Sequence, residues 1–355
     1  MKTNLVGVLT ICILCFLTPN VGQPCTTFFI ASADNSVFGR NLDWINDDGL
    51  VVVNKRGVTK KAYLNTLTWT SKYGSVTFSD SGRDFPLGGM NETGLVVESM
   101  ALDHTKLPFP DSREQITSPQ WIQYQLDNSS SLEDVLSSNS KIRIQYIPIG
   151  NQLHFFVCDK SKACVVIEFI DNKMVYYKGT QLHVKALTNS TYAESIDRWK
   201  SNKIPEPDKS RSIGRFIRAA NMIQSYDQKT STSPIDYAFK ILSNVSHPAY
   251  TQWSIVYDIE NLTIHFHTFS NPKISHVNLK SFDYSCLTPV KIINIDHTLS
   301  GDITDKFVDY TYQLNLQVIK SAFGDVLQQS MPKKSVNQLL DSLAIYPETT
   351  KCEQN

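Results

Sequence analysis

Cys25, Arg40 and Asp43 lie in one short stretch near the start of the chain, and together their side chains could perform nucleophilic chemistry. Asp34-Asn35 is a turn signal between two short runs of β-forming residues. If a hairpin folds at this turn, Asp43 returns to the neighbourhood of Cys25, with Arg40 on the same returning strand. The stretch therefore predicts a thiol, a guanidinium and a carboxylate at one place.

This grouping gains a chemical function if Cys25 becomes the first residue of the mature chain. A free α-amine, with a pKa of about 8, would then lie beside the thiol as a built-in base. Arg40 would favour the thiolate, which is the reactive form of cysteine. Asp43 could accept hydrogen bonds from the α-ammonium, and no histidine would be needed. A strand end with a surface ion pair explains the same residues equally well, so the stretch alone leaves both interpretations open.

The N-terminus predicts how Cys25 could become a first residue. Lys2 is the only charged residue among the first 24, and an apolar run follows at residues 5–17. A basic start, a short apolar run and a polar end are typical of a secretory signal, and the run is short for a membrane span. We expect a signal peptide at 1–22 and export to the periplasm or the exterior.

Cleavage after Gly22 leaves Gln23-Pro24 in front of Cys25. We expect a second cut to remove this dipeptide, 23–24. Either Cys25 attacks the Pro24 carbonyl, or a peptidase that removes X-Pro dipeptides acts on the stub. The remainder, 25–355, shows no internal repeat and no long linker, which predicts a single domain.

The seven cysteines are an odd number, and two of them belong to the expected signal. Export permits disulfides among the others. Cys158 and Cys164 flank a polar loop between two β-rich runs, so a hairpin there would bring them close enough to bridge. Of the three remaining cysteines, we expect Cys286 to pair with Cys352 and Cys25 to stay free. Buried free thiols are the alternative in a reducing compartment.

The composition excludes several classes of partner. The chain has 34 Lys+Arg and 34 Asp+Glu, so its net charge is zero, and it lacks the basic charge that nucleic acid or an anionic membrane would attract. No apolar run after the signal is long enough to span a bilayer. His265 and His267 could share one face of a strand, but no third ligand stands at a diagnostic spacing. We expect no metal, no cofactor and a small-molecule substrate.

Groups of β-rich segments alternate with helical segments along the chain. Antiparallel sheet covered by helices, an α+β fold, is the arrangement that this order favours. Strands are expected at 26–31, 36–40, 51–55, 74–79, 94–100, 153–157, 165–170, 174–178, 184–187, 253–258 and 262–269. Helices are expected at 118–138, 213–225, 235–242 and near 306–323.

Five short motifs, in this order behind an expected signal, resemble those of the choloylglycine hydrolase/penicillin V acylase family. They are CTTF at 25–28, FGRNLDW at 38–44, GMNETGL at 89–95, LTN at 187–189 and RFIR at 215–218. The family comprises linear amide C–N hydrolases of the N-terminal-nucleophile superfamily, and the resemblance covers roughly residues 25–269. It implies a four-layer αββα sandwich of two antiparallel sheets covered by helices.

The resemblance also implies roles for five residues. Cys25 would be the nucleophile and its amine the base, with Arg40 and Asp43 holding both in place. Asn189 would donate its side-chain amide to the oxyanion hole, and Arg215 would orient the substrate or stabilise charge. These assignments predict an enzyme that cleaves a linear amide bond through a thioester on Cys25.

One departure from the family pattern affects the substrate. Many members carry an asparagine ten residues after the residue that corresponds to Asn91, and Ala101 stands there in this chain. Conjugated bile salts, penicillin V-like amides and long-chain N-acyl amides all remain candidate substrates. The alternative is a secreted binding protein that keeps the fold without the activity. A homo-oligomer, a tetramer in many relatives, is expected by analogy only.

Overall fold

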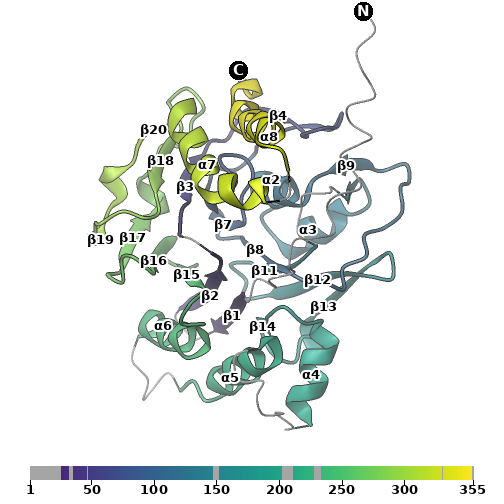
Figure 1. Ribbon diagram of the computed structural model, residues 1–355. Helices are drawn as coiled ribbons and strands as arrows, with labels where there is room; N and C mark the ends of the chain where they lie inside the picture. Colours follow the sequence, from purple (N-terminus) through teal and green to yellow (C-terminus); the bar gives the residue numbers. More distant parts are fainter. Residues whose placement is uncertain are drawn as a thin grey trace, which may run out of the picture.

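The computed structural model describes residues 25–31, 35–45, 47–146, 152–201, 211–227, 233–329 and 331–353. The expected signal at 1–22, the dipeptide at 23–24 and the turn residue Asp34 lie outside the described residues. Two large sheets packed face to face form the body of the protein, and helices lie on both outer sides (Figure 1).

The first sheet contains β1, the strand that begins directly after Cys25. Its strands pair antiparallel except for the short last one, which runs parallel to its neighbour. In spatial order they are β14 (Ala186–Leu187), β1 (Thr26–Ala31), β2 (Ser36–Asp43), β15 (Thr251–Asp258), β16 (Thr263–Thr268), β17 (Ser275–Asn278) and β19 (Gly301–Asp302).

The second sheet is antiparallel throughout. In spatial order its strands are β13 (Lys173–Lys178), β12 (Cys164–Ile170), β11 (Leu153–Cys158), β8 (Val96–Ala101), β7 (Gly88–Asn91), β6 (Ser75–Ser79), β3 (Leu50–Asn54), β18 (Lys291–Asn294) and β20 (Val308–Asp309). Smaller sheets pair β9 (Glu114–Ile116) with β10 (Ile142–Ile144), and β4 (Val58–Lys61) with β5 (Thr68–Thr70) and β21 (Lys351–Cys352).

Aromatic side chains join the two large sheets. Phe38 of β2 packs on Phe156 of β11 with ring centroids 5.2 Å apart, and Phe78 of β6 meets Phe266 of β16 at 5.4 Å. All four rings are fully buried. Burial of each such ring contributes on the order of 2–3 kcal/mol, so this layer is a main source of stability.

Helices cover the outer face of each sheet, which completes the four layers αββα. Helices α5 (Ser212–Gln224) and α6 (Pro234–Val245) pack on β1, β2 and β15, with α4 (Tyr192–Lys200) beside α5. Helix α2 (Ser118–Asn128) packs on β7 and β8, and α3 (Leu132–Ser138) joins the same apolar cluster. The expected α+β fold is confirmed. Short 3₁₀ turns occur at η2 (Gly179–Gln181), η4 (Leu279–Ser281), η5 (Thr304–Lys306) and η6 (Tyr346–Thr349).

Two helix expectations need correction. The single helix expected at 118–138 is two helices, because Ser129 is extended and Ser131 begins a new helix through a capping box with Asp134. The helix expected near 306–323 begins only at Tyr312, since residues before it form η5 and β20, and the Thr311 hydroxyl accepts from the backbone N–H of Leu314. This helix, α7 (Tyr312–Gln328), is followed by α8 (Lys333–Ile345), which was not expected.

Both expected cysteine pairs are disulfides. Cys158 and Cys164 face each other across β11 and β12, and Cys286 is joined to Cys352 over 66 residues of sequence. Cys25 is the free cysteine of the described residues, and it is buried.

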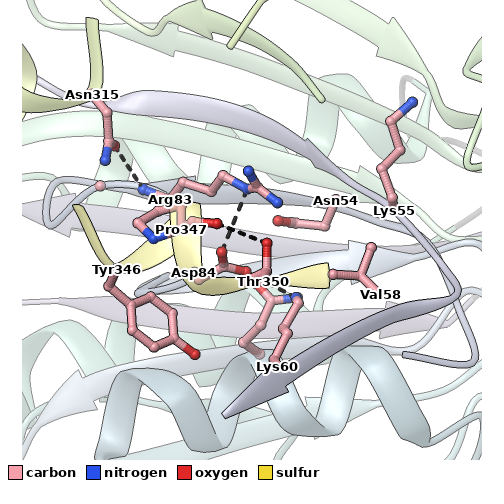
Figure 2. A network of polar contacts seen from close by, with 12 residues as sticks. Asn54, Lys55, Val58, Lys60, Arg83, Asp84, Asn315, Tyr346, Pro347 and Thr350 are labelled. Atoms are coloured by element: carbon pink, nitrogen blue, oxygen red, sulfur yellow. Dashed lines mark hydrogen bonds and ion pairs between the residues drawn. The ribbon is translucent and has the colours of Figure 1, made fainter. Parts of the chain in front are cut away.

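The C-terminal segment is anchored by a buried polar network on β4 (Figure 2). The Lys60 ammonium lies 2.9 Å from the Asp84 carboxylate, and the backbone N–H of Arg83 donates to the Asn315 side chain of α7 at 2.9 Å. The Tyr346 hydroxyl donates to the Lys61 carbonyl at 2.6 Å. The C-terminal helices are therefore attached to the sheet by specific contacts as well as by the second disulfide.

Candidate active site

The hairpin expected around Cys25 is formed by β1 and β2. Thr26 pairs with Asn41 and Thr27 with Arg40, in a register that continues without interruption. Gly39 leaves room for the ring of Phe28, its partner on β1, because a Cβ at position 39 would lie 2.3 Å from that ring. The hairpin therefore places the end of β2 beside Cys25, as the sequence predicts.

The thiol of Cys25 faces the guanidinium of Arg40. The Nη2 atom of Arg40 lies 3.8 Å from the sulfur, and its Nη1 donates to the Ser99 carbonyl. Its Nε forms an ion pair with Glu98 at 3.2 Å. Arg40 is 2% exposed, so its charge acts on the thiol without much screening by solvent.

Asn189 reaches Cys25 because β14 pairs with β1 at Leu187 and Thr27. Its side-chain oxygen accepts from the Cys25 nitrogen at 2.7 Å, and its Nδ2 donates to the Ala101 carbonyl at 2.9 Å. One of the two amide N–H groups thus already has an acceptor. The resemblance implied that this amide points to an oxyanion, and in this structure only its second N–H is available for that.

Arg215 lies in the first turn of α5 and points into the same site. Its Nη1 donates to the Cys25 carbonyl and, at 2.6 Å, to the Thr26 hydroxyl, while Nη2 donates to the Asn189 oxygen at 2.8 Å. The neighbouring Arg218 instead donates to the Asn244 carbonyl at 3.2 Å. Arg215 therefore contacts three residues around the thiol, namely Cys25, Thr26 and Asn189.

Asp43 completes the group of five predicted residues. One carboxylate oxygen accepts from the Thr251 hydroxyl, and the other is buried without a hydrogen-bond partner among the described residues. Burial raises the pKa of Asp43 to about 6, although Arg215, Thr251 and Arg40 act in the opposite direction. A buried carboxylate oxygen of this kind could accept from a new cationic donor.

Burial also raises the pKa of the Cys25 thiol. Arg40 and Arg215 oppose this effect, and the charge of Asp43 adds to it. The thiol is therefore favoured over the thiolate here. In this chain the Cys25 nitrogen is a peptide nitrogen bonded to Pro24. Hydrolysis of that bond would add an ammonium beside the sulfur and lower the pKa of the thiol.

Sequence reasoning missed Glu98 and Tyr257, which lie behind Arg40. The Tyr257 hydroxyl donates to Glu98, whose carboxylate is fully buried. The signal was a single acidic residue inside the largely apolar strand expected at 94–100. A charge in such a run has to find a partner, and Arg40 is that partner.

The remaining site candidates from the sequence are His265 and His267 on β16. The His265 ring stacks on His276. Within the described ranges no group of three or more His, Cys, Asp or Glu side chains could hold a metal ion, and no helix is long and apolar enough to cross a membrane.

Comparisons with a family model and with known proteins point to the same family. The model of the linear amide C–N hydrolases, choloylglycine hydrolase family, matches residues 25–292. Penicillin V acylase from Pectobacterium atrosepticum is 24% identical over 334 residues, covering 78% of this chain and 87% of that protein.

Solved structures agree with this match. Penicillin V acylase from Agrobacterium tumefaciens superposes with a TM-score of 0.69 at 26% identity, covering 81% of this chain and 98% of that chain. An arginine-to-leucine variant of conjugated bile acid hydrolase from Clostridium perfringens shares the fold with a TM-score of 0.67 at 21% identity, covering 78% and 98%. The chain belongs to the choloylglycine hydrolase family of linear amide C–N hydrolases.

Proposed function

We propose that this protein is an exported amidohydrolase whose mature chain begins at Cys25 and which cleaves N-acyl amides through a thioester on that residue. The observation that supports this most directly is the position of the Cys25 nitrogen, which lies 2.7 Å from the Asn189 oxygen. Its sulfur lies 3.8 Å from Arg40. Nitrogen and sulfur of one residue are thus both held by polar side chains.

The proposed reaction has two steps. The α-amine takes the thiol proton, and the thiolate attacks the amide carbonyl. The second N–H of Asn189 stabilises the oxyanion, an interaction commonly worth about 3 kcal/mol. The ammonium then protonates the leaving nitrogen as the C–N bond breaks, which leaves a thioester on Cys25. In the second step the amine takes a proton from water as the water oxygen attacks the thioester carbonyl. The C–S bond then breaks, the acid leaves, and the ammonium returns its proton to the Cys25 sulfur.

The charges around Cys25 support these roles. The unpartnered oxygen of Asp43 is suited to accept from the new ammonium, and Arg215 fixes the Cys25 carbonyl. Two of the relatives reported above are named penicillin V acylase, so phenoxyacyl amides are the first substrates to test. Conjugated bile salts and long-chain N-acyl amides are the other two classes.

The test has two parts. Mass spectrometry of the secreted protein is expected to show a chain that begins at Cys25 and contains neither Gln23 nor Pro24. The wild type and Cys25→Ser are then assayed on penicillin V, on glycine- and taurine-conjugated bile salts and on long-chain N-acyl amides. Hydrolysis that disappears in Cys25→Ser supports the proposal. A mature chain that keeps Gln23, or binding without hydrolysis, supports a silent binding protein instead.

A further inference from the structure

Glu98 is a buried carboxylate behind Arg40, and none of the steps above uses it. It lies on β8 and faces the layer between the two sheets, with its Oε2 3.2 Å from Arg40 Nε and its Oε1 accepting from the Tyr257 hydroxyl. Its neighbour across the β7–β8 pair is Gly88, where a Cβ would lie 2.1 Å from Oε2. In this orientation the carboxylate occupies the space that a side chain at position 88 would need.

Arg40 contacts two groups that can lose a proton, the Glu98 carboxyl and the Cys25 thiol. Its Nε faces Glu98, its Nη2 faces the Cys25 sulfur, and its Nη1 donates to the Ser99 carbonyl. Burial alone would lower the pKa of Arg40, but Glu98 and Cys25 outweigh it and raise that pKa, so the guanidinium stays charged. One buried cation thus serves two groups that can each carry a negative charge.

Few other titratable groups of the described residues act on these three. Asp43 and Arg215 act on Cys25, Asp43 and Tyr257 act on Arg40, and Tyr257 acts on Glu98. Arg40 itself acts on Asp80. Phe156 and Gly88, the strand neighbours of Glu98 on β11 and β7, carry no charge.

We propose that Glu98 shares the Arg40 guanidinium with Cys25, so that the protonation state of Glu98 determines how readily the Cys25 thiol ionises. While Glu98 is ionised, it neutralises Arg40, and a thiolate would be a second buried anion on one cation. Once Glu98 takes up a proton from solution, the charge of Arg40 is left to the thiolate. Glu98 acts through Arg40 and is therefore a positioning residue.

The position of Glu98 allows this exchange near neutral pH. Burial raises the pKa of Glu98 to about 7, even though Arg40 and the Tyr257 hydroxyl both lower it. The two acids titrate as a coupled pair, in which loss of the carboxyl proton makes loss of the thiol proton harder. In mild acid, where Glu98 takes up its proton, the thiolate would then be less disfavoured than it would be beside a carboxylate that stays ionised.

Two variants test this proposal in the purified protein. Glu98→Gln keeps the size of the side chain and an oxygen for Arg40 Nε, but it removes the charge. We expect it to lower the midpoint of the Cys25 titration by about one pH unit or more. Tyr257→Phe removes the hydroxyl that favours the ionised carboxylate, and it should lower the same midpoint by less. The titration is read from the ultraviolet absorbance of the thiolate, with Cys25→Ser subtracted.

Glu168→Gln is the matched control. Glu168 is also a buried acid of the second sheet, but it contacts His154 at 3.1 Å and the Tyr192 backbone N–H at 2.8 Å. This variant should leave the thiol midpoint where the wild type has it. Circular dichroism verifies that each variant is folded. If Glu98→Gln does not fold, Tyr257→Phe still tests the proposal. The proposal is overturned if folded Glu98→Gln or Tyr257→Phe leaves the midpoint unchanged or raises it.

The effect on catalysis rests on the proposed function, whereas the thiol titration does not. If the protein hydrolyses its substrate, the acidic limb of kcat/KM against pH should move to lower pH in Glu98→Gln by the same interval as the thiol midpoint. If the midpoint shifts while even the wild type hydrolyses nothing, the proposed function fails and the role of Glu98 stands.

Discussion

The side-chain oxygen of Asn189 lies 2.7 Å from the Cys25 nitrogen, although 164 positions separate the two residues in the sequence. The same oxygen accepts from Arg215 at 2.8 Å, and the amide nitrogen donates to the Ala101 carbonyl at 2.9 Å. Asn189 therefore connects Cys25, Arg215 and the end of β8. Its orientation is fixed, because each end of the amide has a distinct partner.

Asn189→Ala removes this connection together with the N–H available to an oxyanion. We expect kcat to fall by about 10²–10³-fold, the loss that follows removal of one oxyanion donor. KM should change less, because the oxyanion exists only in the transition state. Kinetics on the best substrate of the panel check this, with the exposed Asn244→Ala as the control. Unchanged kcat in folded Asn189→Ala would contradict the assigned role.

Asp80 gives the protein a pH-dependent stability. Burial raises its pKa from 3.8 to about 6. Below pH 3.8 the Asp80 carboxyl is protonated in both the folded and the unfolded protein. Above about pH 6 the folded protein carries the full cost of a buried charge. The free energy of unfolding therefore falls by about 2–3 kcal/mol as the pH rises from about 4 to about 6.

Asp80→Asn has nearly the same shape and can still accept from the Ser81 hydroxyl, which donates to Asp80 at 2.8 Å. We expect the free energy of unfolding of the variant, relative to the wild type, to increase between pH 4 and pH 7. Urea unfolding at several pH values measures this difference. A difference that stays constant with pH would show that Asp80 has an ordinary pKa.

The two disulfides should contribute unequally to stability. Cys286 and Cys352 close a loop of 66 residues, whereas Cys158 and Cys164 are separated by 6. Loop-closure entropy predicts a loss of about 4 kcal/mol for the double serine variant of the longer loop and about 2 kcal/mol for the shorter one. Thermal unfolding of both double variants gives the order. The reverse order would show that native contacts outweigh chain entropy.

Local sequence was enough to predict much of the hairpin that carries the site. Asp34-Asn35 and the β-rich runs around it predicted that Cys25, Arg40 and Asp43 would meet, and the pairing of Thr27 with Arg40 agrees. The Cys158–Cys164 disulfide was equally predictable, because its two ends lie in one short hairpin. In both cases few residues separate the groups that meet.

Long-range contacts had no such local signal. The proximity of Asn189 and Arg215 to Cys25 was implied only by resemblance to a family. Glu98 was missed because its partner Arg40 lies on the other sheet. The division of residues 118–138 into two helices was missed for a different reason, since the capping box of Ser131 competes with an apolar pattern that continues through it.

Lys60 is a buried cation in the network of Figure 2, and its loss should destabilise the fold. Its ammonium lies 2.9 Å from Asp84 and 3.0 Å from Asp127, and all three side chains are almost completely buried. Lys60→Met leaves two buried carboxylates without this counterion, so we expect a loss of about 3–5 kcal/mol in the free energy of unfolding. Lys60→Met/Asp127→Asn should recover part of that loss, because only one uncompensated charge remains. Equal stability of Lys60→Met and the wild type would show that water or Arg83, whose Nε lies 3.4 Å from Asp84, compensates the carboxylates.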